Sequence, residues 1–264
     1  MHRALRTAVL TCPALLCACE GFEVRPGATS ILEAFQPPPP AEAVKMALSE
    51  DDPNARYRGT QLLAGASFAG EPHLQELFLE RIDDADPGVR ALAIRSVGTH
   101  GTPEHAEKIA AHLTDDEVAV RIEAARALQR LHAPGTLPAL VDALSPAKQE
   151  EHRVRAEAAT ALGQYHDRRA VEALIGALSD ESLLVNTRAR DALRMLTGND
   201  MGLDRRAWNA WYKTTPDVFA ASAGYTYPVF WREKKWYEHI PLIPPPPNEA
   251  PTLPAGLSPT AAAK

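Results

Sequence analysis

The chain has 264 residues, of which 45% are apolar and 23% charged, enough for one or two domains with a hydrophobic core. Its 34 acidic residues outnumber its 28 basic residues, which gives a formal net charge of -6. Proteins that bind nucleic acid by neutralising phosphates normally have the opposite balance, so no nucleic-acid partner is predicted. No apolar run reaches the roughly 18 residues of a membrane-spanning helix, which argues against a polytopic membrane protein.

The N-terminal segment has the layout of an export signal. Two arginines precede a mostly apolar stretch over residues 8–18, which is too short to cross a bilayer as a helix. The stretch ends in Leu16-Cys17-Ala18-Cys19, which resembles the lipobox of bacterial lipoproteins. This resemblance implies that residues 1–18 are a signal peptide and that Cys19 carries a lipid. The protein would then be anchored to a membrane of the cell envelope and face the periplasm; a conventional secretory signal is the alternative.

Cysteine usage agrees with export. Cys12, Cys17 and Cys19 all lie in this segment, so only Cys19 would remain after cleavage. A single cysteine allows no internal disulfide, and it cannot supply a redox pair or a thiolate zinc site. Residues 19–40 end in a run of four prolines and are predicted to be a linker between the lipid and the folded body.

Residues 41–198 contain a repeated pattern. Four valines recur at spacings of 31, 34 and 31 residues, with small residues four and seven positions after each valine. These offsets place the valine and both small residues on one face of an α-helix. The three columns are Val89, Val120, Val154 and Val185, then Ala93, Ala124, Ala158 and Ala189, then Ser96, Ala127, Ala161 and Ala192.

A second apolar pattern with helical spacing lies between successive copies of the first. One example is Leu137, Leu140, Val141 and Leu144. Each unit therefore predicts two amphipathic helices, which are too short to bury their apolar faces alone. Stacked neighbouring units supply the missing contacts. The pattern predicts an all-α fold, an α-solenoid of about five two-helix repeats.

The repeats also carry a family signature. The Asp-Pro-Gly-Val-Arg segment at residues 86–90 and the related segment at residues 154–159 resemble HEAT repeats of the short bacterial, phycobilisome-lyase-like class. The resemblance covers some 150 residues and implies the solenoid fold. It implies little about function, because this fold occurs in scaffolds, lyase subunits and transport factors.

Arginines follow the valines of three repeats, at Arg90, Arg121 and Arg155. The resemblance implies that they form a ladder of hydrogen bonds between adjacent repeats, since a guanidinium can bridge a carboxylate and loop carbonyls. The expected carboxylates lie four or five residues upstream, at Asp86, Asp116 and Glu151. The alternative is an anion-binding groove that also includes Arg95, Arg126, Arg130 and Arg194. Interleaved Glu123 and Glu157 make that face mixed in charge and favour the ladder.

A different segment follows the repeats. The Thr-Gly-Asn-Asp-Met-Gly-Leu-Asp run at residues 197–204, followed by Trp208 and Trp211, resembles a motif that closes many bacterial HEAT-repeat proteins. It implies a short helix that begins after Asp204 and caps the open end of the solenoid. Residues 199–237 hold this cap and an aromatic segment, which either folds back onto the solenoid or binds a partner or glycan. The proline-rich residues 238–264 predict a disordered or polyproline tail.

No catalytic, cofactor-binding or metal-binding residue is predicted. The nine histidines lack metal-ligand spacing, and the sequence has no phosphate loop, Gly-x-Ser-x-Gly turn or His-Glu-x-x-His helix. The sequence favours a non-catalytic, lipid-anchored scaffold that binds a protein partner. Two alternatives stay open: a ligand- or glycan-binding protein that uses the aromatic segment, and an enzyme subunit of the lyase-like class.

Overall fold

The computed structural model describes residues 38–222, 224–227, 235–239 and 252–257, and within them the regular secondary structure is entirely helical. Ten α-helices form five successive pairs, which confirms the predicted α-solenoid. The pairs are α2 (Pro40–Ala47) with α3 (Pro53–Ala64), α4 (Pro72–Arg81) with α5 (Pro87–His100), α6 (Ala106–Ala111) with α7 (Val118–Arg130), α8 (Leu137–Leu144) with α9 (His152–Leu162), and α10 (Arg168–Ala177) with α11 (Leu183–Thr197). Short 3-10 turns, η2 (Pro103–His105), η3 (His112–Thr114) and η4 (Pro134–Thr136), flank α6 and precede α8.

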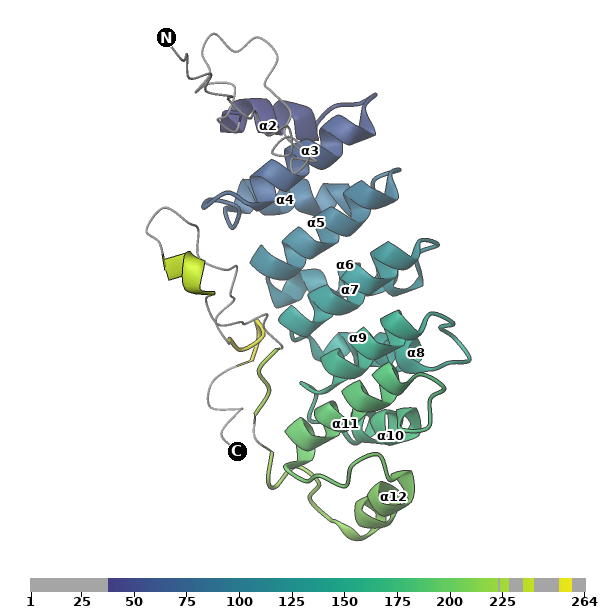
Figure 1. Cartoon of the computed structure of the whole chain (residues 1–264). Helices are drawn as coiled ribbons and strands as arrows, with labels where there is room; N and C mark the ends of the chain where they lie inside the picture. The colour runs from purple at the N-terminus through teal and green to yellow at the C-terminus, as the bar shows by residue number, and fades with distance from the viewer. Residues whose placement is uncertain (1–37, 223, 228–234, 240–251, 258–264) are drawn as a thin grey trace, which may run out of the picture.

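The pairs stack into an elongated solenoid, in which α5, α7, α9 and α11 follow one another in a single row (Figure 1). The three columns of valines and small residues are buried between these helices. Small side chains allow the close approach. A Cβ atom on Gly98 of α5 would lie 2.6 Å from the Cβ of Ala127 of α7, so the two helices are almost in backbone contact there.

Helix α12 (Arg205–Thr214) follows the last repeat and packs against α10 at one end of the solenoid. The chain then returns along the edge formed by the C-terminal ends of α7 and α9, where residues 225–227 and 252–257 lie (Figure 1). Residues 252–257 pair with the solenoid through backbone hydrogen bonds, and so depart from the disordered tail that their proline content predicts. A last turn, η5, spans Trp236–His239. None of the described helices is long and apolar enough to cross a membrane.

Candidate functional site

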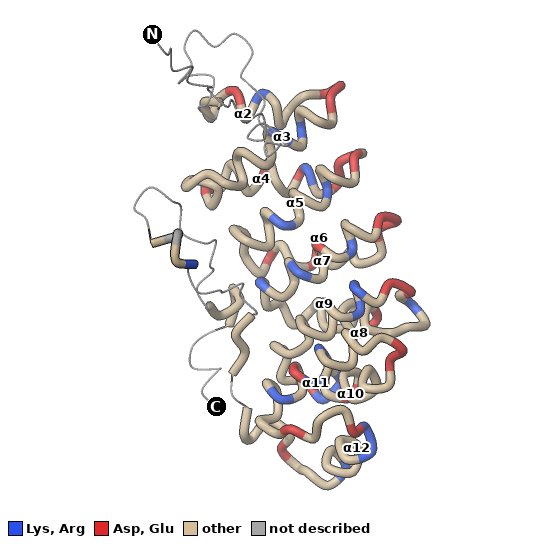
Figure 2. Tube along the Cα trace, in the orientation of Figure 1, with Lys and Arg blue, Asp and Glu red and all other residues tan. Residues whose placement is uncertain are grey.

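Arginine side chains connect consecutive repeats along the edge where the first helix of each repeat turns into the second. Figure 2 shows acidic residues gathered at these turns, with basic residues close by. Arg90, near the start of α5, donates from Nε and Nη2 to both carboxylate oxygens of Asp115 in the next repeat, at 2.9 Å each. Its Nη1 donates to the carbonyls of Asp84 and Ala85 in the turn of its own repeat. One guanidinium thus holds two repeats together.

The same arrangement occurs at two other joints. Arg56 binds Asp84 at 2.8 and 2.9 Å and also reaches two carbonyls of the turn before α3. Arg155 binds Asp180 at 2.8 and 2.9 Å and reaches the carbonyls of the turn before α9. Bidentate arginine–carboxylate pairs fix distance and orientation together, so the ladder sets how each repeat is rotated against the next.

The carboxylates expected from the sequence are not the partners. Asp86 accepts the backbone N–H of Val89 at 3.0 Å, and Glu151 accepts that of Arg153 at 3.1 Å, so both acids cap their own helices. Asp116 contributes only its backbone carbonyl, to Arg121. The prediction failed because it paired residues within one repeat, whereas each arginine extends toward the following one.

The ladder lacks one carboxylate, at the joint between the third and fourth repeats. Gln149 stands five residues before the valine of its repeat, the position that Asp115 and Asp180 occupy in theirs. Its Oε1 accepts a hydrogen bond from the backbone N–H two residues later, that of Glu151. Asp115 and Asp180 each accept the corresponding N–H in their own turns. Arg121 reaches two turn carbonyls through Nη1, but its Nε is buried and has no hydrogen-bond partner among the residues that the structure describes.

Sequence reasoning missed four members of the ladder, and the repeat spacing was the signal that could have found them. Arg56 lies 34 residues before Arg90, in the same column. The carboxylates form a column of their own, five residues before the valines, at Asp84, Asp115 and Asp180.

The ladder carboxylates are held in the ionised form. Burial alone raises the pKa of Asp84, Asp115 and Asp180, but hydrogen bonds from arginine and from a backbone N–H, with the arginine charge, outweigh it. The pKa of each therefore lies below the ordinary 3.8. Because the folded pKa is lowered, this stabilisation is complete above the unfolded value and is lost as the pH falls through the folded one.

A second network crosses the exposed face of the second helices. Arg95 donates to both oxygens of Glu123 at 3.0 and 2.8 Å. Arg126 binds Glu123 at 3.0 Å and Glu157 at 3.1 Å, and Gln129 donates to Glu157 at 2.7 Å. Although the Arg95 side chain is 60% exposed, both arginines are already paired with glutamates. The geometry therefore favours bridges between repeats over an open anion-binding groove.

The structure places the predicted cap residues together at the end of the solenoid. Asp204 accepts the N–H groups of Arg206 and Ala207 at the start of α12. Trp208 is completely buried, and its Nε1 donates to the carbonyl of Gly202 at 3.0 Å. The Trp211 ring packs edge-on against it, with centroids 5.7 Å apart.

The aromatic segment is divided between buried and exposed rings. Tyr225 is buried, donates to the Thr160 carbonyl at 3.3 Å, and has a pKa raised by that burial. The guanidinium of Arg130 lies 4.9 Å from the centre of the Tyr227 ring. Trp236 is 82% exposed. The aromatic residues 230 and 231, like Cys19, lie outside the described part of the chain.

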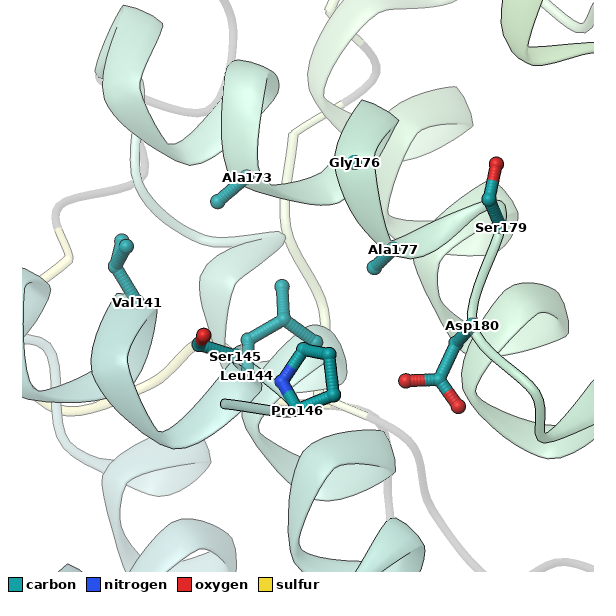
Figure 3. Close-up of a pocket in the computed structure, with 9 residues that line it drawn as sticks. All are labelled: Val141, Leu144, Ser145, Pro146, Ala173, Gly176, Ala177, Ser179 and Asp180. Carbon is teal, nitrogen blue, oxygen red and sulfur yellow. The ribbon is translucent and has the colours of Figure 1, made fainter. Parts of the chain in front are cut away.

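An apolar hollow of about 340 Å³ opens between α8 and α10 (Figure 3). Its lining residues are Val141, Leu144, Ser145, Pro146, Ala173, Gly176, Ala177, Ser179 and Asp180. Gly176 is exposed in the last turns of α10, and in the described part of the chain a Cβ atom there would have no neighbour within 4 Å beyond its own helix backbone and chain neighbours. Among the described residues, no group of three or more His, Cys, Asp and Glu is arranged to hold a metal ion.

Comparison with known proteins agrees with this repeat geometry. The family model for HEAT repeats matches residues 74–151, and that for the PBS lyase HEAT-like repeat matches residues 154–180. These two segments therefore match models of HEAT repeats. No curated protein matches the chain.

Several solved structures are similar to this chain. One is an engineered protein with 20% sequence identity and a TM-score of 0.46, over 68% of this chain and 91% of that one. Another is a chain from the complex of CpcE and CpcF of phycocyanin lyase from Nostoc sp. PCC7120, with 22% identity and a TM-score of 0.44, over 58% and 98%. A third is a designed armadillo repeat protein, with 16% identity and a TM-score of 0.47, over 68% and 95%.

Restoring the missing ladder carboxylate should stabilise the protein. Gln149→Asp gives the Arg121 guanidinium a charged acceptor, and hydrogen bonds to charged groups contribute about 1.5–3 kcal/mol. Part of this is offset by burying the new carboxylate, so we expect a gain of about 1–2 kcal/mol in the free energy of unfolding by urea at neutral pH. In an Arg121→Met background the same substitution should bring no gain. An equal gain in both backgrounds would show that Arg121 is not the partner.

Proposed function

We propose that this protein is a non-catalytic scaffold that binds a protein partner and is tethered to the bacterial envelope by a lipid on Cys19. The main support for partner binding is the apolar hollow between α8 and α10. It lies in a stack of HEAT-like repeats that arginine–carboxylate pairs connect. An exposed apolar patch rimmed by polar residues is a typical mark of a protein interaction site.

Gly176 supports a docking role for the hollow. Glycine inside a helix costs about 0.5–1 kcal/mol relative to alanine. Among the described residues, no atom beyond its own helix backbone and chain neighbours lies within 4 Å of the position of its Cβ, so packing within this part of the solenoid does not require glycine there. A partner whose surface closely approaches the α10 backbone at this position would require glycine. Two further apolar side chains lie just beyond the lining residue Asp180, at the start of α11: Leu183 is 68% exposed and Leu184 42%.

The tether is proposed from the sequence. Residues 19–40 would connect the lipid to α2, and a protein held at a membrane meets partners in that membrane at a raised effective concentration. The net charge of -6 gives no electrostatic attraction to anionic lipid, so the acyl chains would supply the anchoring.

The two alternatives receive less support. Binding of a ligand or glycan by aromatic rings would require accessible rings, but Trp208 and Tyr225 are buried and Arg130 covers Tyr227. Among the described residues of the aromatic segment, Trp236 is the exception, because its large ring is exposed. A lyase-like role is suggested by the match of residues 154–180 to the PBS lyase HEAT-like repeat, but that match is to a repeat unit and identifies no reacting group.

Filling the hollow should remove partner binding without loss of stability. Gly176→Leu adds a side chain where there is open space and improves helix propensity by about 0.8–1 kcal/mol. In proximity labelling in the native envelope, wild-type protein should label a defined set of proteins and Gly176→Leu should lose members of it. Gly176→Ala, which leaves most of the hollow open, is the matched control. An identical set for Gly176→Leu, at equal expression, would contradict docking at the hollow.

Removing the lipid site should release the protein. We expect Cys19→Ser to abolish acylation, detected as the loss of lipid mass, and to move the protein from the membrane to the soluble fraction. Cys12→Ser should do neither, because that residue lies in the cleaved segment. A Cys19→Ser protein that is processed normally and stays with the membrane would show that the lipoprotein assignment is wrong.

A further inference from the structure

The connection between the third and fourth repeats carries a bound peptide, which is part of the same chain. The backbone N–H of Ala255 donates to the carbonyl of Arg130 at 2.8 Å, and the N–H of His132 donates to the carbonyl of Ala255 at 2.7 Å. This is a parallel β-bridge between Leu131 and Ala255. A peptide that adds itself to an extended backbone edge is a recurring mode of peptide recognition.

The receiving edge is also held by contacts within the repeats that do not involve the tail. Leu131 has the extended dihedral angles φ -114 and ψ 123. Its carbonyl accepts a hydrogen bond from Gln164 at 3.2 Å, and the carbonyl of Ala133 accepts one from the Tyr165 hydroxyl at 3.3 Å. The ring of Tyr165 also lies against His132, with centroids 4.9 Å apart. Because these contacts fix the edge from the repeat side, we expect the site to keep its shape when the tail leaves, which lowers the entropic cost of binding a peptide.

The bound segment fits the site residue by residue. Pro254 is buried and Ala255 packs against the solenoid core. The N–H of Leu257 donates to the carbonyl of Pro254, closing a tight turn in which Gly256 has a φ of +93. A Cβ atom on Gly256 would lie 2.6 Å from the His132 carbonyl oxygen and 2.7 Å from Pro103. Both the backbone conformation and the available space thus demand glycine.

We propose that the Arg130–Ala133 edge is a peptide-binding site specific for an extended segment with a Pro-Ala-Gly core, and that residues 252–257 occupy it as an intramolecular ligand. The site is distinct from the hollow between α8 and α10, and the inference does not rest on the scaffold function. A free peptide with the same core competes with the tail for the two backbone hydrogen bonds.

The test uses the full chain and a fluorescent peptide with the sequence of residues 250–258. Gly256→Val should expel the tail, so the peptide should bind this variant saturably and bind the wild-type chain more weakly. With an effective tail concentration of roughly 1 mM, a peptide with a Kd of about 100 μM is weakened about tenfold by the wild-type tail. A second peptide with valine in place of the glycine should not bind. The His132 amide should also exchange with solvent faster in Gly256→Val than in wild type.

Two further variants make the result decisive. Ala255→Pro suits the second position of the turn but removes the N–H that donates to Arg130, so it should also free the site. Thr252→Val, a substitution at an exposed tail residue, should behave as wild type. The proposal is overturned if the peptide binds wild type and Gly256→Val equally, if it binds neither, or if the valine peptide binds as well as the glycine peptide.

Discussion

Three of the four joints of the solenoid are built on one interaction: a guanidinium at the start of a repeat's second helix binds both its own turn and a carboxylate of the next repeat. At Arg90 it does so with two carbonyls on one side and the Asp115 carboxylate on the other. The planar, bidentate pair allows little rotation between repeats. The contacts between small residues, such as Gly98 with Ala127, need that fixed geometry because their helices nearly touch. Asp180, which lines the hollow between α8 and α10, is bound by Arg155 in the same way.

The joint between the third and fourth repeats has this interaction only in part, and it is there that the returning C-terminal segment crosses. On one edge Arg121 faces a repeat that carries Gln149 in place of aspartate. On the opposite edge Tyr225 binds the end of α9, while Ala255 binds the end of α7. The segment therefore bridges the same two repeats from the other side. A tail that can be displaced by peptide would couple occupancy of the Arg130–Ala133 edge to the stiffness of this joint.

The sequence predicts the fold well because the spacing of apolar and small side chains shows the helical periodicity directly. The columns of Val89 and Ala93 define a buried face, and stacking of such faces leaves few alternatives to a solenoid. The arginines of the ladder could be predicted because they form a column in the repeats. The pairing of Arg90 with Asp115 could not be predicted from the residues of one repeat, because it depends on how neighbouring repeats stack. The docking of residues 252–257 rests on backbone groups and one glycine at positive φ, so it leaves almost no side-chain signal.

A pair of double-mutant cycles tests the ladder most directly. The first combines Arg90→Met with Asp115→Asn, and the second combines Arg121→Met with Gln149→Ala. Both cycles measure the free energy of unfolding. We predict a coupling energy of about 1.5–3 kcal/mol for the first cycle and below about 0.5 kcal/mol for the second. Coupling of equal size at both joints, or none between Arg90 and Asp115, would contradict the conclusion that arginine–carboxylate pairs hold the repeats in register.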